Sequence, residues 1–66
     1  MKIGSWVKVT SSPYLSIKAG MVGEITGEKF PNSATYHQYK VLFRKKGTWT
    51  FWPQELEETD EPRRKH

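Results

Sequence analysis

Cysteine is absent from this 66-residue chain. Its absence excludes disulfides, thiolate zinc sites, thiol-ligated iron–sulfur clusters and a cysteine nucleophile. Long apolar runs are absent too: no segment approaches the roughly 20 apolar residues of a membrane-spanning helix, and residues 1–20 lack the continuous apolar segment of a signal peptide. We therefore expect a soluble, cytoplasmic protein without a membrane span.

Acidic residues are scarce until late in the chain. Residues 1–54 contain eight lysine and arginine side chains but only two glutamates, a net charge of +6. Residues 55–61 then carry five carboxylates, and three basic residues follow, so the whole chain has a net charge of +4. A positive body favours a polyanionic partner, either nucleic acid or an acidic protein surface. The alternative interpretation is charge that serves only solubility.

Groups that could perform catalysis or hold a metal are few. Asp60 is the only aspartate, and no Ser-His-acid set or glycine-rich phosphate loop is present. His37 has no second histidine or cysteine at ligand spacing, and His66 ends the chain. A chain this short also leaves little volume for a deep substrate cavity. We therefore expect a monomeric protein with no enzymatic activity, no metal and no cofactor.

What the chain does contain is five short apolar runs punctuated by glycine. They lie at residues 4–9, 19–25, 39–43, 49–52 and 55–57. Val7 and Val9 alternate with polar residues, as do Tyr39, Val41 and Phe43 apart from one leucine between them. This period of two indicates half-buried strands. The pattern predicts an all-β fold, a small five-stranded barrel.

The segments between the runs predict how the strands are connected. Glycines at 20, 23 and 27 indicate bends or bulges, and Pro53-Gln54-Glu55 suits one 3₁₀ turn before the last strand. Tyr14 and Leu15 are expected to fold back over one end of the barrel. Residues 29–38 form a long loop. We expect the barrel to span residues 1–58 and residues 59–66 to be a disordered charged tail.

The order of these motifs is similar to that of a known group of small barrels. Met-x-Ile-Gly-x-x-Val-x-Val, Gly-x-Val-Gly-Glu-Ile, Val-x-Phe and Phe-x-x-x-Glu-Leu follow one another along the chain, and the resemblance that they carry spans roughly residues 3–57. This succession resembles the SH3-like barrels of electron-transport accessory proteins, namely the small E-type subunit of photosystem I, the variable chain of ferredoxin-thioredoxin reductase and the ferredoxin-docking S-type subunit of the photosynthetic NADH-dehydrogenase-like complex. It also resembles the KOW and Tudor-like barrels, which bind RNA, ribosomal sites or protein tails.

The first resemblance implies an SH3-like barrel without a cofactor, which uses a basic face to seat an acidic redox partner or to pack against a larger subunit. It transfers only positions of the fold and no binding residue. Those positions are Gly4, Val7, Val9, Gly20, Gly23, Val41, Phe43, Phe51 and Leu56.

Candidate binding residues come instead from charge and aromatic content. Four cations lie on one predicted strand and the turn after it, close enough to face one anionic surface: Lys40, Arg44, Lys45 and Lys46. Exposed aromatic rings beside cations can stack on bases or form protein hot spots. The candidate rings are Trp49, Trp52, Tyr14 and Tyr36. The alternative interpretation is a solvated hairpin tip with rings that only shield the barrel.

Strand parity adds two expectations. Trp49 and Phe51 are predicted to share one face, with Trp52 on the other, and Glu24 and Glu28 are predicted to share a face without an obvious partner. The acidic segment at 55–61 is either a solvated end or folds back on the cations and competes with an anionic partner.

The sequence thus predicts a non-catalytic binding module, an accessory or docking protein that presents a basic, aromatic surface to an acidic protein or a larger complex. The alternative is a nucleic-acid-binding small barrel that uses the same residues on phosphates and bases.

Overall fold

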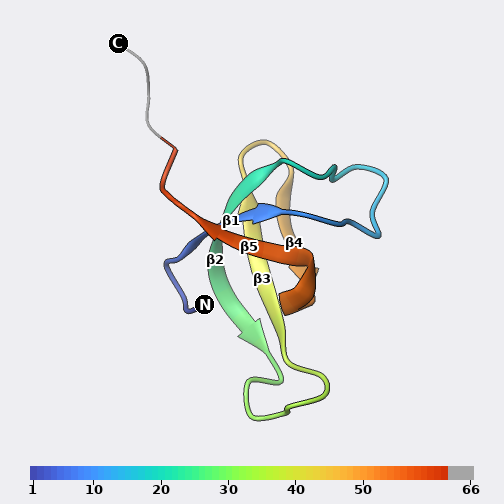
Figure 1. Ribbon diagram of the computed structural model, residues 1–66, viewed down its shortest axis with the longest axis vertical. Coiled ribbons are helices and arrows are strands. Elements are labelled where there is room, and N and C mark those ends of the chain that lie inside the picture. Colours follow the sequence, from blue (N-terminus) through green and yellow to red (C-terminus); the bar gives the residue numbers. More distant parts are fainter. Residues whose placement is uncertain (63–66) are drawn as a thin grey trace.

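Five antiparallel strands and one short 3₁₀ helix make up the fold (Figure 1). The computed structural model describes residues 1–62. The elements are β1 (Trp6–Val9), β2 (Val22–Lys29), β3 (Gln38–Phe43), β4 (Gly47–Phe51), η1 (Pro53–Glu55) and β5 (Leu56–Thr59). The predicted all-β fold with a 3₁₀ turn before the last strand is confirmed. Among the described residues, no helix has the length and apolar character needed to cross a membrane.

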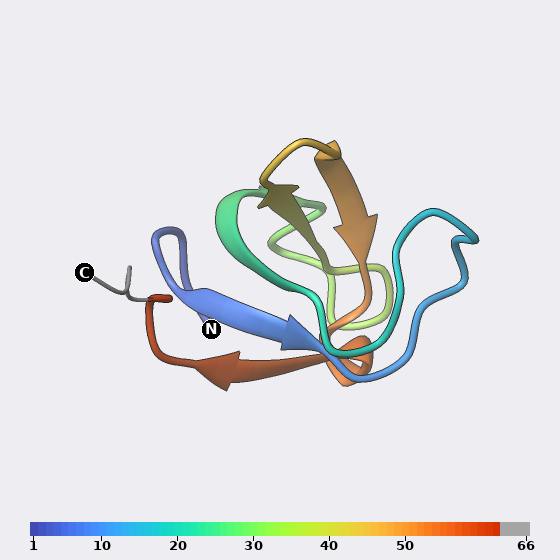
Figure 2. The same cartoon turned by 90° about the horizontal axis from the view of Figure 1, so that it is seen from above.

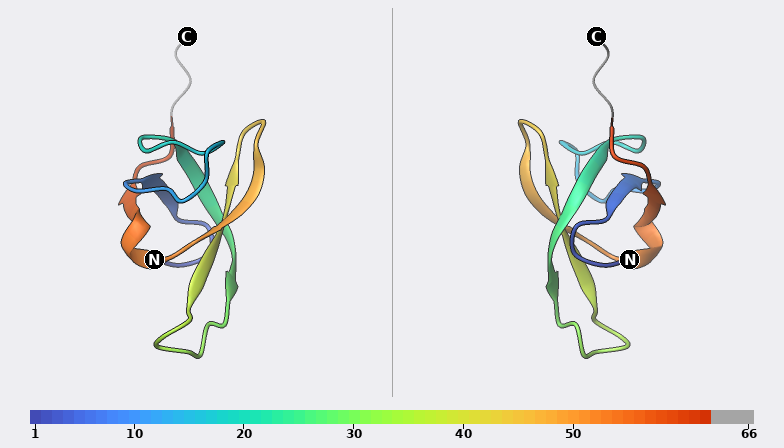
Figure 3. Two further views of the ribbon diagram at one scale, coloured as in Figure 1. Left: turned by 90° about the vertical axis from the view of Figure 1, so that its right-hand side faces the viewer. Right: turned by 90° about the vertical axis from the view of Figure 1, so that its left-hand side faces the viewer.

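The strands form one sheet in the order β4-β3-β2-β1-β5. Figures 2 and 3 show that β2 curves strongly, so that the β1–β5 pair and the β3–β4 hairpin lie on opposite sides of the molecule. The hydrogen-bonded ladder is open, with β4 and β5 as its two edges. The sheet therefore wraps around one core without a ladder between its edge strands.

The core comes from one face of each strand. Alternate residues of β1 and β3 are buried, and the residues between them point outward. The buried set includes a residue from the segment between β1 and β2: Val7, Val9, Ile17, Ile25, Tyr39, Val41, Phe43, Phe51 and Leu56. All five strands therefore contribute to a single apolar cluster.

Strand β2 differs most from its prediction. It begins at Val22 because Gly20 lies in a turn at φ +97°, a conformation that favours glycine. The pairing with β3 shifts register between Ile25 and Gly27, which marks a β-bulge. The bulge reverses the parity of the following residues, so Glu28 lies opposite Tyr39. The expectation that Glu24 and Glu28 share a face is therefore wrong.

The connection from β1 to β2 folds over the core, but with a different pair of residues from the pair predicted. Tyr14 is half-buried and packs against the core, and Ile17 is fully buried. Leu15 lies between them and is 97% exposed. The expectation that Leu15 covers the end of the core is wrong, because the segment turns Tyr14, as expected, and Ile17 inward instead.

The ends of strands β4 and β5 differ slightly from the predicted boundaries. Strand β4 ends at Phe51, one residue before the predicted end, and Trp52 precedes the 3₁₀ turn. Strand β5 pairs with β1 as far as Thr59, which is the first residue of the predicted tail 59–66. Residues 63–66 of that predicted tail lie outside the described residues.

Candidate binding surface

The four predicted cations lie on the β3–β4 hairpin and are all exposed. Lys40 points outward from β3, opposite Thr50, and the other three form the turn, Arg44 to Lys46. Within residues 1–62, the only contact shorter than 4.0 Å between a basic and an acidic side chain joins His37 and Glu28. No described carboxylate therefore forms an ion pair shorter than 4.0 Å with the hairpin cations.

One of the turn's cationic residues has a strained backbone conformation. The Lys46 N–H donates to the Phe43 carbonyl at 3.2 Å, and Lys45 has φ +70°. A residue with a Cβ atom in this left-handed region costs about 1 kcal/mol more than glycine. Lys45 therefore occupies a backbone position that favours glycine, and strained positions of this kind often lie at functional sites, so the turn is a functional candidate.

An open groove borders the turn on the outer face of the sheet. The cross-strand pairs place Trp6 beside Glu24 and Glu24 beside Leu42, so these three residues form a row across β1, β2 and β3. Leu42 is 43% exposed, although the outer face of a strand is normally polar. The groove is lined by Trp6, Val22, Glu24, Leu42, Phe43, Arg44, Lys45, Asp60, Glu61 and Pro62. Its floor, the row across the strands, is apolar at Trp6 and Leu42 with Glu24 between them, and its lining also carries two cations, Arg44 and Lys45, and two further carboxylates, Asp60 and Glu61.

Trp49 and Tyr14 lie on the other side of the hairpin. Trp49 faces inward with Phe51, as predicted from parity, because these residues pair with Val41 and Tyr39 on the core face of β3. The Trp49 indole N–H donates to the Lys46 carbonyl at 2.8 Å, and its ring centroid lies 4.8 Å from that of Tyr14. The Trp49 side chain therefore contacts the backbone of the cationic turn at Lys46.

The Tyr14 hydroxyl fastens the β1–β2 connection to the edge strand, since it donates to the Thr50 carbonyl at 2.6 Å. We expect Tyr14→Phe to lower the free energy of unfolding by about 1 kcal/mol, because the bond is lost while the ring packing remains. Urea denaturation measures the change. Tyr36→Phe is the matched control, because it removes a hydroxyl from a ring that is 62% exposed and should leave the midpoint unchanged. Equal midpoints for both variants would contradict the role of this bond.

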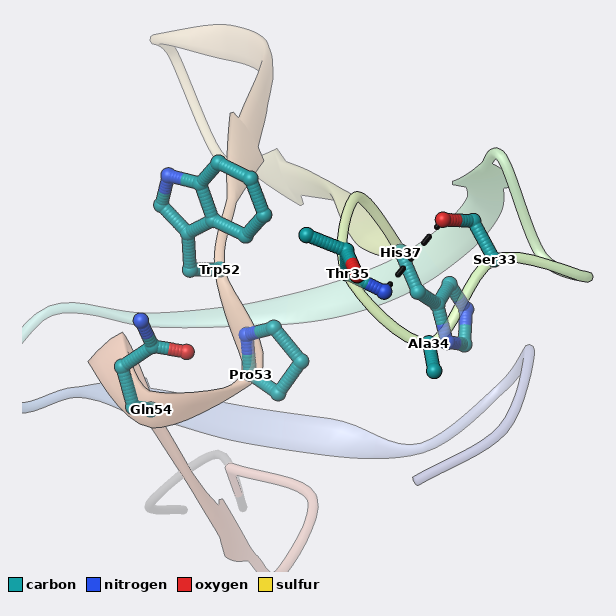
Figure 4. A pocket seen from close by; sticks show the side chains of 7 residues that line it. All are labelled: Ser33, Ala34, Thr35, His37, Trp52, Pro53 and Gln54. Carbon is teal, nitrogen blue, oxygen red and sulfur yellow. Dashed lines mark hydrogen bonds between the residues drawn. The ribbon is translucent and has the colours of Figure 1, made fainter.

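Trp52 and Tyr36 lie toward the opposite end of β3 from the turn. Tyr36 is exposed in the β2–β3 loop, at the lower end of Figure 1. Trp52 lines a hollow of about 380 Å³ between that loop and η1. Figure 4 shows the rings of Trp52 and Pro53 on one side of the hollow and residues of the loop on the other. The full lining is Ser33, Ala34, Thr35, His37, Trp52, Pro53 and Gln54.

His37 is the only ionisable residue in the lining of this hollow. Its Nε2 atom lies 3.3 Å from a Glu28 carboxylate oxygen, and its ring centroid lies 4.6 Å from that of Tyr39. Glu28 thus has a partner that parity alone did not suggest. The hollow offers hydroxyl, amide and aromatic groups but no free cation, so it differs chemically from the groove.

The structure divides the eight predicted site residues among three places. The four cations stay together on the hairpin, Trp49 and Tyr14 pack behind it, and Trp52 and Tyr36 lie toward the far end. Sequence reasoning missed the groove residues Trp6 and Val22, because they lie far from the cations along the chain. The available signal was Leu42, an apolar residue at an outward position.

Comparisons of this chain with protein-family models, with curated proteins and with solved structures find no match.

Proposed function

We propose that this protein is a non-catalytic docking module whose cationic hairpin binds an acidic segment of a protein partner. The observation that carries the proposal is the group of exposed hairpin cations that form no ion pair shorter than 4.0 Å within residues 1–62, beside a groove that includes the apolar side chains of Trp6 and Leu42. Arginine and lysine attract carboxylates and raise the rate of association, and burying apolar side chains such as Trp6 and Leu42 against a partner adds affinity. An extended acidic segment that also carries apolar residues would satisfy both parts.

Binding to nucleic acid, the alternative, is less well supported by the positions of the rings. Base stacking needs an exposed aromatic face beside the cations. Of the four rings that the sequence predicts, Trp49 packs against Tyr14 and donates its indole N–H to the backbone, while Trp52 and Tyr36 lie toward the other end of β3. Trp6 lines the groove with Arg44 and Lys45, but it is half-buried and shares its row with Leu42 and Glu24 rather than with a second ring. The outward neighbour of the cations on β3 is Leu42, which suits a protein contact.

We expect Arg44→Glu/Lys45→Glu to weaken binding of a synthetic peptide of Asp, Glu and Leu at least about 10-fold at low salt, because two attractions become repulsions. Titration calorimetry measures the dissociation constant. Lys2→Glu/Lys29→Glu is the matched control, since both lysines are exposed and neither lines the groove. It makes the same change in net charge.

An equal loss of affinity in the two variants would contradict the proposal, because it would show that only net charge matters. Single-stranded oligothymidylate is titrated in parallel. Tighter binding of oligothymidylate than of the peptide, lost in the turn variant, would select the nucleic-acid function instead.

A further inference from the structure

The groove beside the hairpin contains carboxylates from the chain's own C-terminal segment. Asp60 and Glu61 line it together with Arg44 and Lys45. Both carboxylate residues are exposed and, within residues 1–62, neither forms an ion pair shorter than 4.0 Å with the cations. Opposite charges therefore share one groove without being locked together.

The register of β5 brings this segment to the groove. Thr59, the last residue of β5, pairs with Trp6, which lies on the groove floor. Asp60 follows directly, so the chain leaves the sheet beside the floor. Figures 1 and 3 show the segment after β5 leaving at the same end of the molecule as the β3–β4 turn.

The other acidic residues of the C-terminal part are placed elsewhere. A carboxylate oxygen of Glu55 accepts a hydrogen bond from the Trp52 backbone N–H at 2.8 Å. Glu57 and Glu58 belong to β5, where they pair with Lys8 and Val7, and neither lines the groove. Of the five carboxylates in residues 55–61, two are thus positioned to act on the hairpin cations.

We propose that the segment Asp60 to Pro62 is a built-in competitor for the groove, which mimics the acidic partner and lowers its affinity. This proposal rests on the proposed function and adds a regulation of the same surface. A tethered segment competes at a high effective concentration, so even weak contacts reduce the binding of a free partner. Removing the competing charges therefore strengthens binding of the partner.

The test is the double variant Asp60→Asn/Glu61→Gln, which removes the two charges and retains the length of the chain. We expect the Asp, Glu and Leu peptide to bind about 3-fold to 10-fold more tightly than to the wild type at low salt, as weak exposed charge contacts allow. The gain disappears at high salt, where such contacts are screened. Titration calorimetry gives the dissociation constants.

Glu57→Gln/Glu58→Gln is the matched control, because it changes the net charge equally on β5, away from the groove.

A second readout needs no peptide. In the free protein, Asp60→Asn/Glu61→Gln is expected to shift the backbone amide resonances of Leu42, Arg44 and Lys45, and the control is expected to leave them in place.

Two results overturn the competitor. One is unchanged peptide affinity in Asp60→Asn/Glu61→Gln, and the other is an equal gain in both double variants. If Arg44→Glu/Lys45→Glu still binds the peptide more weakly than the wild type does, the proposed function survives that failure. If Arg44→Glu/Lys45→Glu binds the peptide as tightly as the wild type does, the proposed function fails, and the competition fails with it.

Discussion

Gly23→Ala is expected to lower the free energy of unfolding by about 3 kcal/mol, because forcing an extra methyl into a packed core strains the side chains and the backbone. Gly23 is buried on β2 against β3. A methyl group there would lie 2.7 Å from Val41 Cγ1, 2.8 Å from the Leu42 carbonyl oxygen and 3.0 Å from Phe43 Cδ1. The carbonyl belongs to the centre of the sheet and cannot move without disturbing the ladder on both sides.

A domain of this size has a total stability of about 5 kcal/mol, so this loss is a large fraction. Urea denaturation followed by circular dichroism measures it, and the midpoint temperature should fall by more than about 10 °C. Gly27→Ala is the matched control, because its methyl group would meet the flexible side chain of Lys40, with the nearest atom Cδ at 3.3 Å. Equal stability of the two variants would contradict the packing of β2 against β3.

Phe51→Ala is expected to unfold the protein or leave it marginally stable, since deleting a buried phenylalanine costs about 3 to 5 kcal/mol. Phe51 is fully buried, and its ring packs edge-on against Tyr14 at 5.3 Å and Phe43 at 5.9 Å between centroids. Its removal opens a cavity where the β1–β2 connection meets the hairpin. Loss of dispersion in the amide proton spectrum reports the unfolding.

Phe51→Leu is the control for Phe51→Ala, because it keeps most of the apolar volume. It should cost less than half as much and leave a dispersed spectrum. A Phe51→Ala variant that melts within a few degrees of the wild type would contradict a core centred on this ring.

The parts of the fold that alternation specifies could be predicted from the sequence. The apolar residues of β1 and β3 repeat every second position, and those strands have the buried faces that the pattern indicates. Pro53 fixes the backbone where a 3₁₀ turn begins, and the turn is present. These features are local, so neighbouring residues determine them.

The remaining parts depend on contacts between distant segments. The glycines at 20, 23 and 27 indicate bends or bulges, and the bulge lies between Ile25 and Gly27, but the sequence does not show that it changes which face Glu28 occupies. Tyr14 and Ile17 pack inward while Leu15 is exposed. Three apolar residues in one irregular segment carry no period, so the sequence could not distinguish among them.

The same distinction applies to the candidate site. Arg44 and its neighbours are adjacent in the chain, so the sequence already grouped them. The groove floor joins Trp6 to Leu42 through the pairing of three strands, and Asp60 reaches it through β5. Only the register of the sheet brings these residues together.

The most direct test of the central claim, that the cationic hairpin and its groove form the binding surface, is a map of amide chemical shifts during titration with the Asp, Glu and Leu peptide. We predict that the largest shifts occur at Trp6, Val22 and the residues from Leu42 to Lys46, with a dissociation constant that rises with salt. Shifts confined to residues 30–37 and Trp52, or no shifts at all, would contradict the account.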